Sequence, residues 1–214
     1  MNLQEFQQLP VLGILRGGDK EILPALAETL VAAGLKTVEI TMNTPQAVGM
    51  IRQMVRSADG RLTVGAGTVL TREDAKAACD AGATFIVSPV LIGEVADFCV
   101  NQAIPFFPGA LTPQEIYQAW HAGAAMVKVF PAKFFGPDYF REIKGPFEDV
   151  ALLACGGVTP GTLSAYFASG ASAVAFGGSV FRRELLNPSG LSRIEEDVRL
   201  LIQAHHSILN NKSI

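Results

Sequence analysis

The sequence predicts an α/β fold in which eight short parallel strands alternate with helices and close into a (β/α)8 barrel. Three observations predict it. The strand candidates are continuous apolar runs, typical of parallel sheets covered on both faces. Four helix-like stretches end in a glycine that can leave the helix in a left-handed conformation, at Gly34, Gly82, Gly123 and Gly170. No linker or low-complexity stretch divides the 214 residues, so we expect one domain over residues 1–214.

The elements follow in a regular order. A short helix at Leu3–Gln8 is expected to cover the barrel bottom, and an amphipathic helix at Leu191–Ile208 to close the chain. The eight strands are expected near Val11–Leu15, Thr37–Ile40, Leu62–Ala66, Phe85–Ser88, Ile104–Phe107, Met126–Phe130, Val150–Ala154 and Ala173–Phe176. Capping threonines with an early proline or acidic residue mark helix starts at Thr44, Thr71, Thr112 and Thr159. Strict alternation implies right-handed crossovers, and eight units favour a TIM barrel over an open doubly wound sheet, which would need clearer edge strands.

Composition excludes several classes of function. The net charge of −3 and the pI near 5.6 argue against a dedicated surface for nucleic acid or anionic membranes. The three cysteines form no CxxC pair, which argues against a zinc site and favours reduced thiols. The N-terminus lacks the basic and long apolar regions of a signal peptide, and no apolar run is long enough to span a membrane. We therefore expect a cytoplasmic protein with no metal and no cofactor.

Lys128 interrupts an apolar run, Ala124 to Ala132, that has the pattern of a buried strand. A lysine is rarely buried without a partner, because removing its charge from water is costly. A desolvated lysine can act as an amine nucleophile or a base. From this segment alone, Lys128 can equally end its strand in solvent or pair with a carboxylate.

In a barrel of this kind the active site lies at the carboxyl ends of the strands. One glutamate, Glu39, joins Lys128 among the strand ends, within the apolar run Thr37 to Thr41, and Arg16 ends the first strand. Glu39 can neutralise buried charge as a structural ion pair, or it can move protons while Lys128 forms a covalent adduct. The Thr68 hydroxyl, after the third strand, is available for a hydrogen bond to a substrate.

Two late glycine turns predict an anion site. Gly156 and Gly157 end the seventh strand, and Gly178 and Ser179 follow the eighth. Glycines let backbone N–H groups approach an oxyanion, and phosphate sites after these two strands are common in this fold. A single such turn is weak evidence, but two in the expected places favour phosphate binding.

Other candidates are weaker. The segment from Gly65 to Thr68 lacks the third glycine and the later acidic residue of a dinucleotide motif. His205 and His206 are adjacent on the last helix and cannot share a face, and His121 ends a helix. Lys133 is a rival nucleophile, but it lies in a loop beyond the sixth strand.

These residues resemble a known family, the 2-keto-3-deoxy-6-phosphogluconate (KDPG) and 4-hydroxy-2-oxoglutarate (KHG) aldolases. The resemblance covers essentially the whole chain, because seven short motifs recur in the family's order. They are Gly13-Ile14-Leu15-Arg16, Val38-Glu39-Ile40-Thr41, Gly65-Ala66-Gly67-Thr68-Val69-Leu70, Ile86-Val87-Ser88-Pro89, Lys128-Val129-Phe130-Pro131-Ala132, Gly156-Gly157-Val158 and Gly177-Gly178-Ser179.

The resemblance implies a class I aldolase that works as a homotrimer of barrels on a small-molecule substrate. Lys128 would form the Schiff base with the keto acid, and Glu39 would shuttle protons. It further implies that Arg16, Asn43 and Thr68 surround the substrate carboxylate and that Pro89 and Phe130 line the pocket. Gly156, Gly157, Gly178 and Ser179 would cradle the distal phosphate.

Two departures bear on the substrate. Many gluconate-type members have an arginine where this chain has Asn43, and a threonine where it has Cys155; in both places the chain is more similar to the 6-phosphogalactonate type. We expect cleavage of 2-keto-3-deoxy-6-phosphogluconate, with the galactonate epimer or 4-hydroxy-2-oxoglutarate as alternatives. A barrel that binds a phosphorylated ligand without catalysis, or a sugar-phosphate isomerase or epimerase, are the alternatives from other classes.

Overall fold

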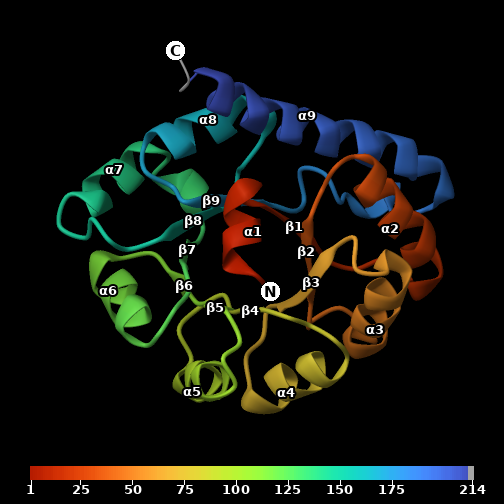
Figure 1. Cartoon of the computed structure of the whole chain (residues 1–214), viewed down its shortest axis with the longest axis horizontal. Helices are drawn as coiled ribbons and strands as arrows, with labels where there is room; N and C mark the ends of the chain where they lie inside the picture. Colours follow the sequence, from red (N-terminus) through yellow and green to blue (C-terminus); the bar gives the residue numbers. More distant parts are fainter. Residues whose placement is uncertain (212–214) are drawn as a thin grey trace.

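The strands close into a barrel. The structure is a computed structural model that describes residues 1–211, so the last three residues of the predicted domain lie outside it. Nine parallel strands form one sheet in the order β5-β4-β3-β2-β1-β9-β8-β7-β6. The two ends of this order, β5 (Phe106–Phe107) and β6 (Gly109–Ala110), are consecutive in the chain and separated only by Pro108. The chain itself therefore completes the ring, and the predicted barrel is confirmed (Figure 1).

The predicted fifth strand is the one that differs. The segment expected at Ile104–Phe107 is shortened to β5, and a further strand that was not expected, β6, follows after Pro108, which has no N–H group for the ladder. Every other expected strand is present, with ends that differ by a few residues. They are β1 (Val11–Leu15), β2 (Thr37–Thr41), β3 (Thr63–Gly67), β4 (Ile86–Val87), β7 (Val127–Val129), β8 (Leu152–Cys155) and β9 (Ala173–Phe176).

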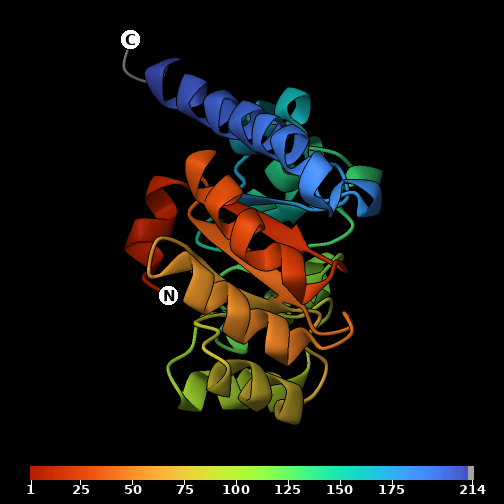
Figure 2. The same cartoon turned by 90° about the vertical axis from the view of Figure 1, so that its right-hand side faces the viewer.

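The helices surround the strands, as Figures 1 and 2 show. They are α1 (Leu3–Gln8), α2 (Leu23–Ala32), α3 (Ala47–Ala58), α4 (Arg72–Asp80), α5 (Gly93–Asn101), α6 (Pro113–His121), α7 (Asp138–Lys144), α8 (Pro160–Ala168) and α9 (Leu191–Asn211). Short 3-10 turns are η1 (Lys20–Ile22), η2 (Ala132–Phe134), η3 (Arg183–Leu185) and η4 (Pro188–Gly190). Within the described part of the chain, no helix combines the length and apolar character that crossing a membrane requires.

Three of the four predicted caps are present. Thr71 accepts a hydrogen bond from the Asp74 N–H, and Thr112 forms a capping box with Glu115. Thr159 is the N-cap residue of α8, where its N–H donates to the Thr162 hydroxyl at 3.0 Å and the two hydroxyl oxygens lie 3.2 Å apart. The fourth prediction was wrong, because α3 begins at Ala47 and Thr44 lies before it.

Thr44 instead forms hydrogen-bond contacts with the turn after β1 and with Thr41. Its hydroxyl oxygen accepts a hydrogen bond from the Gly17 N–H at 3.0 Å and lies 3.1 Å from the Thr41 hydroxyl. A threonine engaged with the turn after β1 cannot cap the following helix. The sequence pattern gave no sign of this long-range partner.

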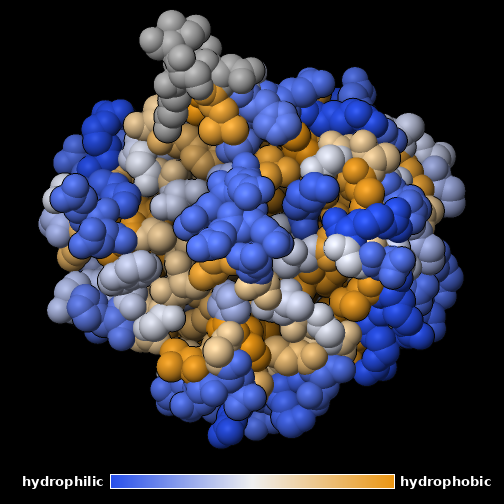
Figure 3. Space-filling model, in the orientation of Figure 1, coloured by the Kyte–Doolittle hydropathy of each residue, from blue (hydrophilic) through white to orange (hydrophobic). Residues whose placement is uncertain are grey.

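Two separate cores hold the barrel together. The larger one lies between the strands and the outer helices, and the smaller one fills the inside of the barrel. Phe6 of α1 belongs to the inner core and stacks on Phe107, whose ring in turn contacts Phe85. Helix α1 therefore closes the amino-terminal end of the barrel with Phe6 and the partly buried Leu3, while its outer face is polar (Figure 3). The site can then open only at the opposite end.

Candidate active site

Lys128 and Glu39 both lie inside the barrel. Lys128 is in the middle of β7 and is 7% exposed, and Glu39 is in the middle of β2 and is 1% exposed. In the register of the sheet, Glu39 is level with Ile14 of β1 and Gly65 of β3, and Lys128 with Gly109 of β6. The structure therefore brings together the two ionisable residues that the sequence singled out.

The Glu39 carboxyl has no hydrogen-bond partner for either oxygen among the described residues. Burial raises its pKa above the usual value of 4.5, and Lys128 and then Arg16 oppose that rise. A buried carboxylate without hydrogen bonds is costly, and such groups are common at functional sites. The arrangement leaves both oxygens free to exchange a proton with a ligand or a water molecule.

Gly67 makes room for this carboxyl. A Cβ atom at Gly67 would lie 2.0 Å from Glu39 Oε1, so any side chain there would displace the carboxyl. The neighbouring Thr68 has φ of +52°, a conformation that few residues other than glycine adopt. Strained backbone of this kind is concentrated at functional sites.

Lys128 is covered by two neighbours. Its Nζ lies 5.3 Å from the centre of the Phe130 ring, which is itself 40% exposed. Cys155, at the end of the adjacent strand β8, is buried beside it. Burial raises the pKa of the Cys155 thiol, while the neighbouring Lys128 opposes that rise.

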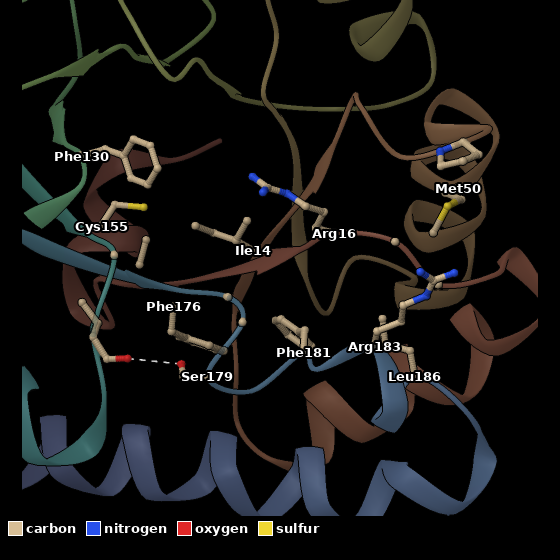
Figure 4. A pocket seen from close by; sticks show the side chains of 18 of the residues that line it. Ile14, Arg16, Met50, Phe130, Cys155, Phe176, Ser179, Phe181, Arg183 and Leu186 are labelled. Atoms are coloured by element: carbon tan, nitrogen blue, oxygen red, sulfur yellow. Dashed lines mark hydrogen bonds between the residues drawn. The ribbon is translucent and has the colours of Figure 1, made fainter. Parts of the chain in front are cut away.

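A cavity of about 1200 Å³ opens above these residues at the carboxyl ends of the strands. Figure 4 shows Arg16 extending into it, with Phe130 and Cys155 on one side and Arg183 near Met50 on the other. Six of the predicted site residues line this cavity: Arg16, Phe130, Gly156, Gly157, Gly178 and Ser179. No ion pair engages Arg16 in the part of the chain that the structure covers, so its charge is available to an anionic ligand.

The two glycine turns provide free hydrogen-bond donors. Across residues 1–211, the N–H groups of Gly157, Gly178 and Ser179 donate to no protein acceptor. Gly156 and Gly157 have φ of +97° and +81°, which places the turn after β8 in a conformation that favours glycine. The Ser179 hydroxyl donates to the Val158 carbonyl at 3.3 Å and so joins the two turns (Figure 4). Helix α8 begins two residues after Val158, so its N-terminus also favours an anion here.

Five predicted residues do not line this cavity: Lys128 and Glu39 are buried beneath its wall, and the other three lie elsewhere. Pro89 lines a smaller, separate cavity of about 260 Å³ that shares Phe130 with the large one. Thr68 is half-buried at the end of β3 and lines neither cavity, and Asn43 is exposed in the connection before α3 and also lines neither. Asn43 and Thr68 therefore do not join Arg16 at the surface of the large cavity, and their contact with the substrate carboxylate stays a prediction.

Several lining residues escaped the sequence analysis. Gly17 and Gly18 follow β1 with φ of +80° and +84°, and they form a third double-glycine turn beside the same cavity. Their adjacency was the available signal, because the other two glycine turns were found in that way. Arg183, in η3, had no such signal, because a 3-10 turn beyond the last strand has no periodic pattern.

Comparisons with known proteins agree on one family. The family model for KDPG and KHG aldolase matches residues 3–196. A 2-dehydro-3-deoxy-6-phosphogalactonate aldolase of Escherichia coli is 34% identical, over 82% of this chain and 86% of the relative. A 2-dehydro-3-deoxy-phosphogluconate aldolase of Pseudomonas aeruginosa is 37% identical, over 77% of this chain and 74% of the relative.

Solved structures agree with the sequence relatives. The "Native KDPGal structure" superposes with a TM-score of 0.88 at 30% identity, covering 95% of this chain and 97% of that one. A 4-hydroxy-2-oxoglutarate/2-deydro-3-deoxyphosphogluconate aldolase superposes with a TM-score of 0.82 at 32% identity, covering 95% and 98%. With the matching fold, these similarities establish that the chain is a member of the KDPG and KHG aldolase family, whose members are carbon–carbon lyases.

Proposed function

We propose that this protein is a class I aldolase that reversibly cleaves a 2-keto-3-deoxy-6-phospho sugar acid to pyruvate and glyceraldehyde 3-phosphate. One observation carries the proposal. A buried lysine and a buried glutamate without hydrogen bonds lie beneath a cavity whose rim presents unused N–H donors. A protein that only binds a ligand has no need of this nucleophile and this free carboxyl.

In the proposed reaction, Lys128 Nζ attacks the C2 carbonyl, and the carbinolamine loses water to give a protonated imine. Breaking the C3–C4 bond sends its electron pair into the imine, while the C4 hydroxyl gives up its proton and becomes the aldehyde. The resulting enamine takes up a proton at C3, and water then releases pyruvate. The imine itself accepts the electrons that a metal ion would otherwise stabilise.

Glu39 is the proposed proton carrier. Neither of its oxygens has a hydrogen-bond partner among the described residues, and burial raises its pKa toward neutral pH. A group whose pKa lies nearer to the working pH accepts and releases a proton more readily. A water molecule between Glu39 and the substrate would complete the route. Arg16 is the proposed partner of the substrate carboxylate, since its guanidinium extends into the cavity without an ion pair (Figure 4).

The distal phosphate is proposed to bind between the turns after β8 and β9. The unused N–H groups of Gly157, Gly178 and Ser179 support this, as does the N-terminus of α8. An isomerase or epimerase could use Glu39 as a base and could bind phosphate here, but its chemistry would not require an imine-forming lysine.

The preferred epimer depends on residues near C4 of the substrate. Our first candidate is 2-keto-3-deoxy-6-phosphogluconate, and the galactonate epimer and 4-hydroxy-2-oxoglutarate are the alternatives. The relatives named for the two epimers are 37% and 34% identical, so identity does not separate them. Cys155, at the cavity wall where gluconate-type members have threonine, favours the galactonate alternative.

Pyruvate release tests the proposal directly. The purified protein is mixed with each of the three substrates, and pyruvate is measured through NADH oxidation by lactate dehydrogenase. We expect release from at least one phosphorylated sugar acid, and loss of at least 100-fold in Glu39→Gln if Glu39 moves the proton. No pyruvate from any of the three would contradict the proposal.

We also propose that the protein assembles as a homotrimer, as the family resemblance implies. Phe134 and Phe135, in the connection between β7 and α7, are 71% and 57% exposed, and self-association would give such rings a partner. Sedimentation equilibrium gives the mass directly, and a monomer at micromolar concentration would contradict this part of the proposal.

A further inference from the structure

We propose that Lys133 is the cation that binds the distal phosphate, and that it makes this enzyme selective for phosphorylated substrates. The inference rests on the proposed function, because it deepens the assignment of the phosphate site. The sequence had presented Lys133 only as a rival nucleophile. Its position in the structure gives it a different role.

Lys133 packs against the glycine turn after β8. A Cβ atom at Gly157 would lie 2.6 Å from the Lys133 Cβ and 3.5 Å from its Cα. A Cβ atom at Gly156 would be in ordinary contact with the segment before Lys133, 3.5 Å from the Cα of Pro131. The lysine side chain therefore leaves the backbone directly beside the unused N–H donor of Gly157.

The charge of Lys133 is not engaged elsewhere. Its side chain is exposed and lines the large cavity, and among residues 1–211 it forms no ion pair or hydrogen bond. Its Nζ lies 5.2 Å from the centre of the Phe134 ring, which is itself highly exposed. A contact of this kind at an exposed site is weak, so the ammonium group can turn toward a phosphate at little cost.

Neutral N–H groups alone do not neutralise the two negative charges of a phosphate dianion. A charged donor roughly doubles the strength of each hydrogen bond to phosphate. The other cations that line the cavity are Arg16, Lys20 and Arg183. Arg16 lies at the centre, and Phe181 separates Arg183 from Ser179 (Figure 4). Lys20 is in η1, and none of its atoms is among those nearest to Gly156 or Gly157. Lys133 is the lysine of this cavity whose backbone touches the phosphate turn.

The test compares two substrates that differ in the phosphate. Wild type, Lys133→Met and Lys133→Arg are assayed for pyruvate release from the cleaved phospho sugar acid and from 4-hydroxy-2-oxoglutarate. The expected result for Lys133→Met is a rise in KM of about 10- to 100-fold for the phosphorylated substrate. Its kcat/KM for 4-hydroxy-2-oxoglutarate should stay within about twofold of wild type, and Lys133→Arg should recover part of the loss.

Lys36→Met is the matched control. This exposed lysine precedes β2 at the opposite end of the barrel, so the substitution removes the same charge far from the cavity. It should leave both substrates unaffected. A general charge effect would instead raise KM for the phosphorylated substrate in both lysine variants, and it would overturn the inference.

Two further outcomes separate this inference from the proposed function. Trapping of pyruvate with borohydride should label wild type and Lys133→Met alike, because the imine forms on Lys128. If labelling fails in wild type, the aldolase mechanism is wrong. If labelling succeeds but Lys133→Met treats both substrates as wild type does, only the role of Lys133 is wrong.

Discussion

Replacing Gly67 by alanine should strongly lower activity while leaving the fold intact. The added Cβ would lie 2.0 Å from Oε1 and 2.5 Å from Cδ of Glu39, and atoms of this kind essentially never approach within 3.0 Å. Gly67 does not have a positive φ, so alanine can adopt its backbone conformation without strain. The Glu39 carboxyl is the end of a flexible side chain, so it is the group that moves.

The size of the effect follows from that distance. To lengthen the distance between the added Cβ and Glu39 Oε1 from 2.0 to 3.0 Å, the carboxyl must move by about 1 Å. A displacement of this size in a catalytic group lowers the rate by about 100-fold. We therefore expect kcat/KM of Gly67→Ala to fall about 100-fold, with a melting temperature within a few degrees of wild type.

Gly49→Ala provides the matched control. Gly49 lies within α3, and nothing is within 4 Å of an added Cβ. Alanine in a helix interior is favoured over glycine by about 1 kcal/mol, so this variant should be slightly more stable and fully active. Pyruvate release and thermal unfolding measure both properties in each variant. Activity of Gly67→Ala within threefold of wild type would refute the argument that Gly67 positions Glu39.

Three other predictions concern stability and specificity. Gly65→Ala places a Cβ 2.4 Å from the ring of Phe85 in the inner core, so the free energy of unfolding in urea should fall by about 1–3 kcal/mol; an unchanged midpoint would contradict this. Burial lowers the pKa of His205 below 6.5, so its contribution to stability is present above pH 6.5 and is lost as the pH falls through the lowered value. The melting temperature of wild type should therefore drop between pH 7.5 and 5.5 more steeply than that of His205→Leu, with exposed His121→Gln as the control that keeps the wild-type slope. Cys155→Thr introduces a hydroxyl at the cavity wall and should raise the kcat/KM ratio of the gluconate over the galactonate epimer by about fivefold; an unchanged ratio would exclude Cys155 as a determinant.

The regular parts of the fold could be predicted from the sequence. Apolar strands and glycines at helix ends repeat with the period of the structure, and Lys128 and Glu39 stood out because charge is rare in such strands. The resumption of the sheet after Pro108, as β6, and the late start of α3 were not predicted in this way. They depend on a missing donor in one strand and on a hydrogen bond between Thr44 and Gly17, residues far apart in the sequence.

The site residues in the connections after the strands were less predictable than Lys128 and Glu39, which lie within strands. The family resemblance implied that Asn43 and Thr68 lie beside Arg16, but neither residue lines the large cavity. Connections have no periodic pattern, so the direction of their side chains depends on turns that the sequence does not specify. Lys133 was discounted for being in such a connection, although it lies against the glycine turn after β8.

The most direct test of the central claim is to trap the imine. The protein is incubated with pyruvate, reduced with borohydride, digested and examined by mass spectrometry. We expect one reduced pyruvate imine per chain, on the peptide that contains Lys128, and none in Lys128→Met. An absence of adduct in the wild type, or an adduct that persists in Lys128→Met, would contradict the account.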